Sequence, residues 1–343
     1  MKKVIVTGGY GFIGSNLISV LIKKKYHVIN IDKCFYSSNI YNLTDLRLKN
    51  YNFFKIDLNE KSKIFEILKK YKPSVIFNLA AETHVDRSID GPGPFIRSNI
   101  NGVYNLLEAT RKYIKNTNNK IKFIHVSTDE VYGDMGKTNK KAKENSPYRP
   151  SSPYAASKAS SDHLIKSYIR TYKFPAIISN CSNNYGPKQF PEKLIPKIIY
   201  NILNKKQIPI YSKGLNSREW IYVEDHCRAL ELLSRRGKIG NNYNIGTKNN
   251  LTNLNLTKLI IKIVKKYFLN IKFESKIVFV KDRPGHDYKY ALNSNKIKRE
   301  LNWRPLIDIN EGLKKTIKWY FDNPKYFQNV NKKHYVKRIG LKK

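Results

Sequence analysis

Short apolar runs alternate with amphipathic stretches through the first half of the chain. The runs are rich in β-branched residues, as in buried strands, and the stretches between them place apolar residues at helical spacing. Strands separated by helices predict an α/β protein with a Rossmann-type, doubly wound parallel sheet covered on both faces. We expect strands at Lys3–Thr7, His27–Asp32, Phe53–Leu58, Ser74–Ala80, Ile121–Thr128 and Ala176–Cys181, and helices near 12–25, 60–71, 95–115 and 154–172.

The pattern loosens beyond residue 186, where Gly186 and Pro187 predict a loop. Residues 1–186 are expected to form one domain, to which the chain returns near 218–235. Residues 187–330 are expected to form mainly a second, smaller lobe, and residues 331–343 a basic tail. The elements expected in the smaller lobe are a helix near 191–204, strands around 208–211 and 276–280, and an amphipathic helix near 311–321.

Composition excludes several classes of protein. The 343 residues are 41% hydrophobic, which excludes a disordered chain, and no apolar run is long enough for a membrane helix. Cys34, Cys181 and Cys227 are too few and too far apart for a disulfide framework or a cysteine metal site, so we expect no metal. The first residues lead directly into a strand pattern without the apolar segment of a signal peptide, so we expect a cytoplasmic protein.

The net charge is large and positive. The chain has 65 basic and 26 acidic side chains, a balance of +39, which can indicate a nucleic-acid partner. The lysines are scattered through every segment and form no single stripe. We therefore interpret most of them as a solvated surface, with some capacity to steer an anionic substrate, and expect neither a nucleic-acid nor a membrane partner.

A glycine-rich stretch, Thr7–Gly14, joins the first predicted strand to the first helix. Residues without Cβ allow a tight turn and close backbone approach, and the helix amino end presents free N–H groups to a pyrophosphate. Asp32 at the end of the second strand is placed to bind an adenosine ribose and to repel a 2′-phosphate, an effect that neighbouring Lys33 opposes. Together these features favour NAD over NADP as the cofactor.

Tyr154 and Lys158 form a second candidate constellation. Ser152 is a suitable N-cap and Pro153 a suitable first residue for a helix, on which Tyr154 and Lys158 share one face. A lysine ammonium, the helix amino end and a positively charged nicotinamide can lower the phenol pKa from near 10 toward ~7, which is worth about 4 kcal/mol. Tyr154 is therefore the predicted base for oxidation of an alcohol.

Two adjacent acids, Asp129 and Glu130, follow Thr128 at the end of the fifth predicted strand. In a regular strand their side chains would point to opposite faces, so both reach one substrate only if the chain turns directly after Thr128. Two carboxyls in a partly desolvated cleft, with pKa values pushed apart, make an acid and a base. On the residues alone, a solvated acidic turn or a helix cap remains the alternative.

Longer motifs carry a resemblance to a known family. From about residue 3 to 325 the chain resembles the extended short-chain dehydrogenase/reductases, and its Thr-Asp-Glu triplet resembles that of the members that dehydrate dTDP-glucose. The motifs are Leu79–Ser88, Ser127–Gly133, Ser152–His163, Asn180–Pro187, Pro191–Pro196, Pro209–Tyr211, Tyr222–His226 and Asp282–Asp287.

The resemblance implies a lyase that oxidises C4 of dTDP-glucose, eliminates water across C5 and C6, and reduces C6, for deoxysugar synthesis such as that of dTDP-rhamnose. It implies that NAD is tightly bound and regenerated in each cycle, and that the chain forms a homodimer through the helices near 95–115 and 154–172. Tyr154, assisted by Thr128, would take the 4-hydroxyl proton, Glu130 the C5 proton, and Asp129 would protonate the leaving hydroxyl. The catalytic residues implied are Thr128, Asp129, Glu130, Tyr154 and Lys158.

Binding residues are also implied by the resemblance, which makes residues 1–186 the NAD-binding domain and residues 187–330 mainly the sugar-nucleotide-binding lobe. An arginine fork suits a diphosphate and a tyrosine face suits a base; the alternatives are core packing for Tyr211 and a structural role for His286. For NAD the residues are Gly8, Gly11, Phe12, Ile13, Gly14, Asp32, Lys33, Asp57, Leu58, Ala80, Ala81, Ser98, Tyr154, Lys158 and Asn184. For the sugar nucleotide they are Thr83, Thr128, Asn183, Lys193, Leu194, Pro209, Tyr211, Arg218, Asn253, Arg283 and His286.

Three departures from the family pattern stand out. Phe35 replaces a small polar residue beside the adenosine ribose, Glu219 replaces the aspartate after Arg218, and the segment 134–144 is short and rich in lysine. The first two are expected to weaken cofactor or diphosphate contacts.

Two other functions remain open at this point. A dehydratase for another nucleotide sugar, or a 4-epimerase, would use the same cofactor loop and Tyr/Lys pair. Product analysis separates the epimerase, because its product keeps the 6-hydroxyl. A basic nucleic-acid-binding module with the same fold would bind with a steep salt dependence and would not need the acids. The intact set from Thr128 to Lys158 argues against that module.

Overall fold

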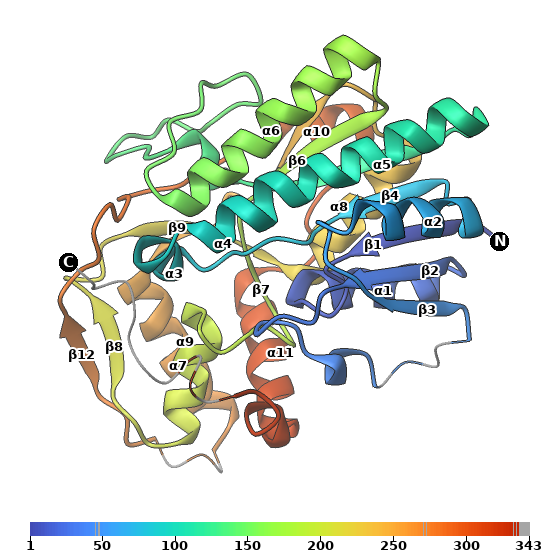
Figure 1. Cartoon of the computed structure of the whole chain (residues 1–343). Coiled ribbons are helices and arrows are strands. Elements are labelled where there is room, and N and C mark those ends of the chain that lie inside the picture. The colour runs from blue at the N-terminus through green and yellow to red at the C-terminus, as the bar shows by residue number, and fades with distance from the viewer. Residues whose placement is uncertain are drawn as a thin grey trace.

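The computed structural model describes residues 1–44, 46, 49–269, 271, 273–331, 333 and 335. At its centre lies a parallel sheet of seven strands in the order β10-β6-β5-β4-β1-β2-β3 (Figure 1). The predicted Rossmann-type, doubly wound sheet is therefore confirmed. The strands are β1 (Lys3–Thr7), β2 (His27–Asp32), β3 (Tyr51–Lys55), β4 (Val75–Asn78), β5 (Lys122–Thr128), β6 (Ala176–Cys181) and β10 (Asn242–Ile245).

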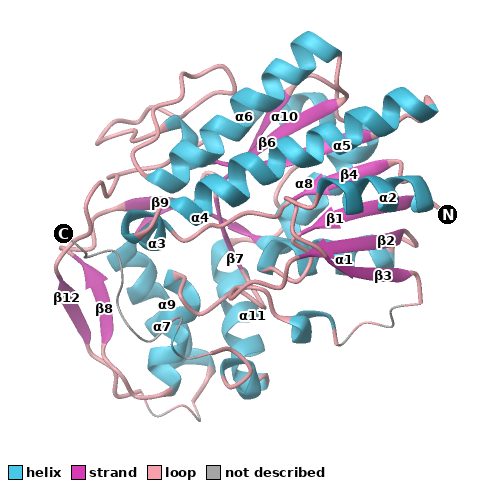
Figure 2. Ribbon diagram, viewed as in Figure 1, coloured by secondary structure: helices cyan, strands magenta, loops and turns pink. Residues whose placement is uncertain are grey.

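Helices cover both faces of this sheet (Figure 2). Side chains alternate along each strand, so Ile5 of β1 packs with one group of helices and Val4 with the other. The first group is α2 (Lys61–Tyr71), α5 (Gly102–Thr117) and α6 (Pro153–Tyr172), and the second is α1 (Phe12–Lys23), α8 (Val223–Arg236) and α10 (Asn295–Leu301). Burial on both sides explains why the strands are continuously apolar in the sequence.

A smaller lobe has its own hydrophobic core, to which Ile198, Ile260 and Tyr320 belong. It contains α7 (Leu194–Leu203), α9 (Asn253–Tyr267), α11 (Ile309–Asp322), the 3₁₀ helix η4 (Pro324–Phe327) and the parallel pair β8 (Ile208–Tyr211) and β12 (Ile277–Val280). A three-stranded sheet, β11-β9-β7, is formed by β7 (Asn183–Tyr185), β9 (Ser217–Tyr222) and β11 (Asn250–Thr252). Of the predicted basic tail, Asn331, Lys333 and Tyr335 are described, and Tyr335 is buried in this lobe; the rest lies outside the described residues.

Several boundaries differ from the sequence predictions. The strand predicted at 53–58 ends at Lys55, where its ladder with β2 ends, so Asp57 and Leu58 lie in the following loop. The helix predicted near 95–115 is divided into α4 (Gly93–Phe95), a π-helical segment η2 (Ile96–Asn101) and α5. The return of the chain after residue 218 extends through β10 and α10, because β10 pairs with β6. Short elements that periodicity did not predict include η1 (Ile40–Leu43) and α3 (Val85–Asp90).

No helix among the described residues combines the length and the apolar composition that crossing a membrane requires. Cys34, Cys181 and Cys227 all lie in the described part of the chain and are free thiols.

Glu219, one of the departures from the family pattern, connects three segments of the scaffold. Its side chain is fully buried, and its carboxylate accepts hydrogen bonds from the backbone N–H groups of Thr247 at 2.6 Å, Lys248 at 2.9 Å and Leu292 at 2.9 Å. The first two groups lie between β10 and β11, and the third lies just before α10. The carboxylate therefore joins β9 to both segments.

Glu219→Gln is expected to lower the free energy of unfolding by about 1–3 kcal/mol. One oxygen becomes an NH₂ group that faces a backbone donor, and a buried donor facing another donor cannot make a hydrogen bond. Urea denaturation of the two proteins measures the difference. Glu224→Gln, at an exposed position of the next helix, is the control and should stay within about 0.5 kcal/mol of the parent. An equal, near-zero effect of both changes would contradict this role of Glu219.

Candidate active site

The glycine-rich loop lies where the sheet topology places ligand sites. β1 and β4 are neighbours whose connections run to opposite sides of the sheet, and a crevice forms at their carboxyl ends. Gly8 has φ +71°, and a Cβ added there would lie 2.9 Å from the Cα of Ala80. A Cβ on Gly14 would lie 2.1 Å from the carbonyl oxygen of Gly8. Both positions therefore require glycine, and α1 begins after Gly11 without a side-chain cap, which leaves its amino end open to an anion.

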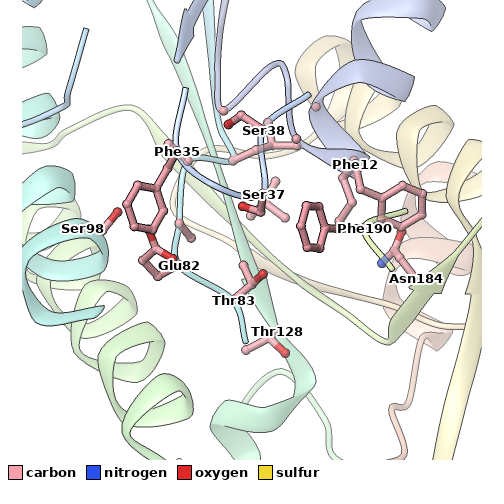
Figure 3. Close-up of a pocket in the computed structure, with 18 of the residues that line it drawn as sticks. Phe12, Phe35, Ser37, Ser38, Glu82, Thr83, Ser98, Thr128, Asn184 and Phe190 are labelled. Atoms are coloured by element: carbon pink, nitrogen blue, oxygen red, sulfur yellow. The ribbon is translucent and has the colours of Figure 1, made fainter. Parts of the chain in front are cut away.

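One cavity joins the carboxyl ends of β1, β2, β4, β5 and β6. Figure 3 shows Phe12, Thr128 and Asn184 reaching it from separate segments of the chain. Every residue that the sequence analysis assigned to NAD lines this cavity: Gly8, Gly11, Phe12, Ile13, Gly14, Asp32, Lys33, Asp57, Leu58, Ala80, Ala81, Ser98, Tyr154, Lys158 and Asn184.

Other lining residues were not predicted. Some stand at strand ends, where their position in the sheet could have indicated them. Others come from loops, and of these Glu82, Ser182 and Glu192 lie within the family motifs quoted above. The strand-end group is Ile31, Leu79, Val126, Ser127 and Cys181, and the loop group is Ser37, Ser38, Ile56, Glu82, Ser182, Gln189, Phe190 and Glu192.

Asp32 is held in place by the loop it faces. Its carboxylate accepts hydrogen bonds from the backbone N–H of Tyr10 at 2.9 Å, the N–H of Cys34 at 2.7 Å and the hydroxyl of Ser38 at 2.8 Å. These bonds fix the carboxylate at the rim of the cavity, at the end of β2.

Phe35, another departure, lines the same cavity. Its ring lies beside Glu82 and Ser98 in Figure 3, and the ammonium of Lys33 sits 4.6 Å from the ring centre. Lys33 also forms an ion pair with Glu82 at 3.3 Å. This side of the cavity is therefore lined by an aromatic ring and an ion pair, whereas the family pattern places a small polar residue at position 35.

Tyr154 and Lys158 lie on α6, which begins as predicted. The Ser152 side chain accepts a hydrogen bond from the N–H of Ala155, and Pro153 is the first helical residue. Both functional side chains are buried, and the Lys158 ammonium donates to the carbonyl of Val126 at 2.8 Å. The two therefore point into the cavity from one helix face.

The pKa values of this pair shift in opposite directions. Burial lowers the pKa of Lys158 to about 8, against an opposing effect of Asp162. Burial and the nearby Glu130 carboxyl raise the pKa of Tyr154 well above its usual value, although a hydrogen bond with Thr128 opposes them. Burial and Glu130 thus outweigh Thr128 in the protein alone, whereas the lowering expected from the sequence also includes the positive charge of a bound nicotinamide.

The chain turns directly after Thr128, as the sequence analysis required. β5 ends there, and a 3₁₀ helix, η3 (Asp129–Tyr132), begins at the next residue. The Thr128 hydroxyl accepts from the N–H of Glu130 at 3.3 Å and donates to the Asp129 carboxyl at 3.2 Å. Asp129 and Glu130 both line the cavity, and in each a buried oxygen, Oδ2 and Oε2 respectively, has no hydrogen-bond partner among the described residues. Two acceptors or donors are therefore free to contact a ligand.

The two carboxyls have different electrostatic surroundings. Burial raises the pKa of Asp129 well above its usual value, and the charges of Glu130 and Glu219 raise it further. Burial also raises the pKa of Glu130, but the positive charges of Arg283, Arg218 and Lys193 oppose this rise. Asp129 is therefore the group that keeps its proton, and Glu130 the one that ionises more readily.

The residues predicted for the sugar nucleotide divide into two groups. Thr83, Thr128, Asn183 and Lys193 line the cavity. The others are not among its lining residues: Leu194 begins α7, Pro209 and Tyr211 lie on β8, Arg218 on β9, Asn253 begins α9, and Arg283 and His286 follow β12.

Asp86, which the sequence analysis did not single out, connects part of this second group. Its carboxylate accepts from the Tyr211 hydroxyl at 2.6 Å and pairs with Arg283 at 2.6 Å. The rings of Tyr211 and His286 meet edge to face at 5.7 Å. Arg218 is buried and donates to backbone carbonyls, including that of Asp287 at 3.0 Å. Asp86 on α3 thus joins Tyr211 and Arg283 of the smaller lobe to the larger domain.

No group of His, Cys, Asp and Glu in the described part of the chain is arranged to hold a metal ion.

The fold and this cavity define a nucleotide-binding enzyme scaffold, and comparison with known proteins identifies the family. The sequence model of the GDP-mannose 4,6 dehydratase family matches residues 5–316, which is most of the chain. The chain belongs to this family of sugar-nucleotide dehydratases.

Individual relatives are more specific. The dTDP-glucose 4,6-dehydratase of Neisseria meningitidis is 44% identical, with both chains covered completely. A crystal structure of the dTDP-glucose 4,6-dehydratase from Streptomyces venezuelae, with NAD and TYD (thymidine diphosphate) bound, has a TM-score of 0.88 and 37% identity, covering 96% of this chain and 100% of that one. A UDP-glucose 4-epimerase from Thermotoga maritima shares the fold with a TM-score of 0.85 and 29% identity, covering 94% and 99%. Overall shape therefore does not separate dehydratases from epimerases.

Proposed function

We propose that this protein catalyses the NAD-dependent dehydration of dTDP-glucose to dTDP-4-keto-6-deoxy-glucose, a lyase reaction that feeds deoxysugar synthesis. One observation carries the proposal: the turn that holds Asp129 and Glu130 opens onto the same cavity as the glycine loop and Tyr154. The dehydratase relatives at 44% and 37% identity support the same activity. An epimerase needs the loop and the tyrosine but has no use for two buried carboxyls beside them.

The residues of the cavity fit NAD. Gly8 and Gly14 leave room for backbone approach, the amino end of α1 suits a pyrophosphate, and the Asp32 carboxylate disfavours a 2′-phosphate. The NAD bound to the Streptomyces relative agrees with this. When bound, NAD supplies a hydride acceptor for C4, a donor for C6 and a positive charge near Tyr154.

The first step is oxidation at C4 of the sugar. Tyr154 removes the proton of the 4-hydroxyl, and the Thr128 hydroxyl shares that hydrogen bond. Lys158, when charged, stabilises the phenolate, which counteracts the rise in phenol pKa caused by burial and Glu130. Because both side chains are buried, water competes little for these contacts.

The second step is elimination of water. Once C4 is a ketone, the C5 proton is acidic, and Glu130 removes it. Asp129, whose burial keeps it protonated, gives its proton to the departing 6-hydroxyl, so one water molecule leaves and a C5–C6 double bond forms. After C6 is reduced, C5 takes back a proton. The surroundings of the two carboxyls support this division into acid and base.

We assign the sugar nucleotide to the space between the lobes. Thr83, Asn183 and Lys193 would contact the sugar and its phosphates from the cavity, and Arg218 and Arg283 would add positive charge for the diphosphate. Leu194, Pro209, Tyr211, Asn253 and His286 would complete the nucleotide site on the smaller lobe. This division matches the proposed domains, residues 1–186 and mainly 187–330.

We also propose a homodimer that uses η2, α5 and α6. Ile96 on η2 and Tyr104 on α5 are each 45% exposed, and apolar side chains of this size on a helix face suit a subunit interface. The free cysteines fit a cytoplasmic protein.

Incubation of the purified protein with dTDP-glucose tests the function. We expect a product one water lighter by mass, with the alkali-induced absorbance of a 4-keto-6-deoxy sugar. UDP-glucose and GDP-mannose are the comparison substrates. For each of them kcat/KM should be at least about tenfold lower than for dTDP-glucose, because a binding site discriminates between substrates that differ in a contacted group. A product of unchanged mass would indicate an epimerase, and a preference for either comparison substrate would reassign the nucleotide.

A further inference from the structure

A buried polar network lies behind the active-site cavity and connects three strands to α6. Its members are Thr7 on β1, Asn78 on β4, His125 on β5 and Asp162 on α6, each at most 1% exposed. The Thr7 hydroxyl donates to Asn78 Oδ1 at 2.8 Å, and Asn78 Nδ2 contacts His125 Nδ1 at 3.0 Å. His125 Nε2 lies 3.4 Å from Asp162 Oδ1.

The proton positions in this network follow from its first member. The Thr7 oxygen accepts from the N–H groups of Leu79 and Ala80, each at 3.1 Å, so its own proton points to Asn78 Oδ1. The amide nitrogen of Asn78 then faces His125 Nδ1, which must be the unprotonated nitrogen. Burial and Lys158 lower the pKa of His125 well below its usual value, so the ring is neutral and carries its one proton on Nε2.

That proton has an acceptor in the hydroxyl of Ser161, 3.4 Å from Nε2, because the proton of that hydroxyl goes to the carbonyl of Lys158 at 2.8 Å. The Lys158 ammonium and Asp162 Oδ1 lie 3.3 Å and 3.4 Å from the same nitrogen, so the two charged groups are close neighbours, and Oδ1 has no hydrogen-bond partner among the described residues. The other carboxylate oxygen, Oδ2, accepts from the hydroxyl of Ser127 at 2.7 Å, the hydroxyl of Tyr148 at 2.9 Å and the amide of Asn180 at 3.4 Å. These neighbours all donate, which is the pattern of an ionised carboxylate.

Asp162 and Lys158 lie one turn apart on α6. The direct hydrogen bond of Lys158 goes to a neutral carbonyl, that of Val126, at 2.8 Å. Asp162 is the first among the groups that raise the pKa of Lys158, against the burial that lowers it to about 8. The other titratable groups around Asp162 are Lys166 on the next turn of α6 and the phenols Tyr132 and Tyr148.

We propose that Asp162 is a positioning residue that keeps Lys158 charged, and that it thereby extends sugar oxidation by Tyr154 to higher pH. The proposal rests on the function proposed above. Burial raises the pKa of Asp162, but the charge of Lys158 and the hydroxyl donors Ser127 and Tyr148 oppose this rise and favour the ionised carboxylate.

The test is the pH profile of dehydration by Asp162→Asn. Removing the negative charge moves the pKa of Lys158 below about 8, so the ammonium, and with it the support for the phenolate, is lost at lower pH. We expect the pH at which kcat falls on the alkaline side of the profile to decrease by about one unit. Above pH 8 kcat should therefore be about tenfold lower than in the parent, whereas near pH 6.5 it should be less than about threefold lower. An equal loss at every pH, or no change, would overturn the proposal.

Two control variants separate charge from packing. Tyr148→Phe removes one hydrogen bond to Asp162 but keeps the carboxylate, so its alkaline limb should stay within about 0.3 pH units of the parent. Asp162→Glu keeps the charge, so the alkaline limb of its kcat profile should lie within about 0.5 pH units of the parent. If Asp162→Asn does not fold, this variant is used for the test. A uniform loss in the glutamate variant, or a limb that moves as far as in the asparagine variant, would contradict the proposal.

A second measurement does not depend on turnover. Trace acetylation across a pH series, with the Lys158 peptide followed by mass spectrometry, measures the titration of that amine directly. We expect its midpoint to fall by about one unit in Asp162→Asn and to stay in Tyr148→Phe. If the parent protein fails to dehydrate any sugar nucleotide, the proposed function fails; an unchanged amine midpoint overturns the role of Asp162 itself.

Discussion

Tyr154→Phe is expected to lower kcat for dehydration by about 10²–10⁴-fold with little change in KM. The phenylalanine ring keeps the packing of the buried side chain but has no oxygen to take the 4-hydroxyl proton. Because this is the first chemical step, neither the ketone nor the reduced cofactor should form. Mixing the NAD-loaded variant with dTDP-glucose and following nicotinamide absorbance in a single turnover measures this step.

Tyr172→Phe is the matched control for that experiment. It makes the same chemical change on the same helix, at a side chain that is half exposed. Its turnover should stay close to that of the parent. If Tyr154→Phe reduced the cofactor at the parental rate, another base would have to be sought in the cavity.

Glu130→Gln and Asp129→Asn are each expected to lower kcat by about 10²–10⁴-fold, but at a later step. In Glu130→Gln the sugar can still be oxidised, while no group takes the C5 proton, so reduced cofactor should accumulate. In Asp129→Asn the C5 proton can still be removed by Glu130, but the leaving hydroxyl has no proton donor. The pKa of Asp129, raised by burial and by Glu130, is the physical basis of that assignment.

Deuterium exchange distinguishes the two variants. In heavy water, Asp129→Asn should exchange the C5 hydrogen of the recovered sugar nucleotide, whereas Glu130→Gln should not. Glu224→Gln, on the exposed face of α8, is the control for a neutralised carboxylate and should behave as the parent. If both site variants dehydrate at full rate while Tyr154→Phe does not, the acid and base roles proposed for this pair are wrong.

Much of the larger lobe could be predicted because its signals are local. Each predicted strand is a continuous apolar run, since helices cover both faces of the sheet, and the boundaries err by a few residues at most in β3 and β4. The strands β7, β9 and β11 were not predicted, because polar residues interrupt them and none is a continuous apolar run. The sequence analysis did not interpret the scattered lysines as a binding site. The cavity is lined mainly by apolar, small polar and acidic side chains.

The sequence by itself determined those chemical features whose residues all lie within one short segment. The glycine loop, the N-cap that starts α6 with Tyr154 and Lys158 on one face, and the pair of acids after β5 each need only neighbouring residues. The turn after Thr128 could be stated as a condition but not established, because backbone direction depends on packing.

Only the tertiary structure decided how these groups are charged and supported. The opposite surroundings of Asp129 and Glu130 come from Glu219, Arg218 and Arg283, which are far away in sequence. The raised pKa of Tyr154 and the link from Thr7 through Asn78 to His125 likewise depend on which side chains meet when strands and helices pack. Desolvation and Coulomb interactions depend on distance in space, and the order of residues along a chain does not specify that distance.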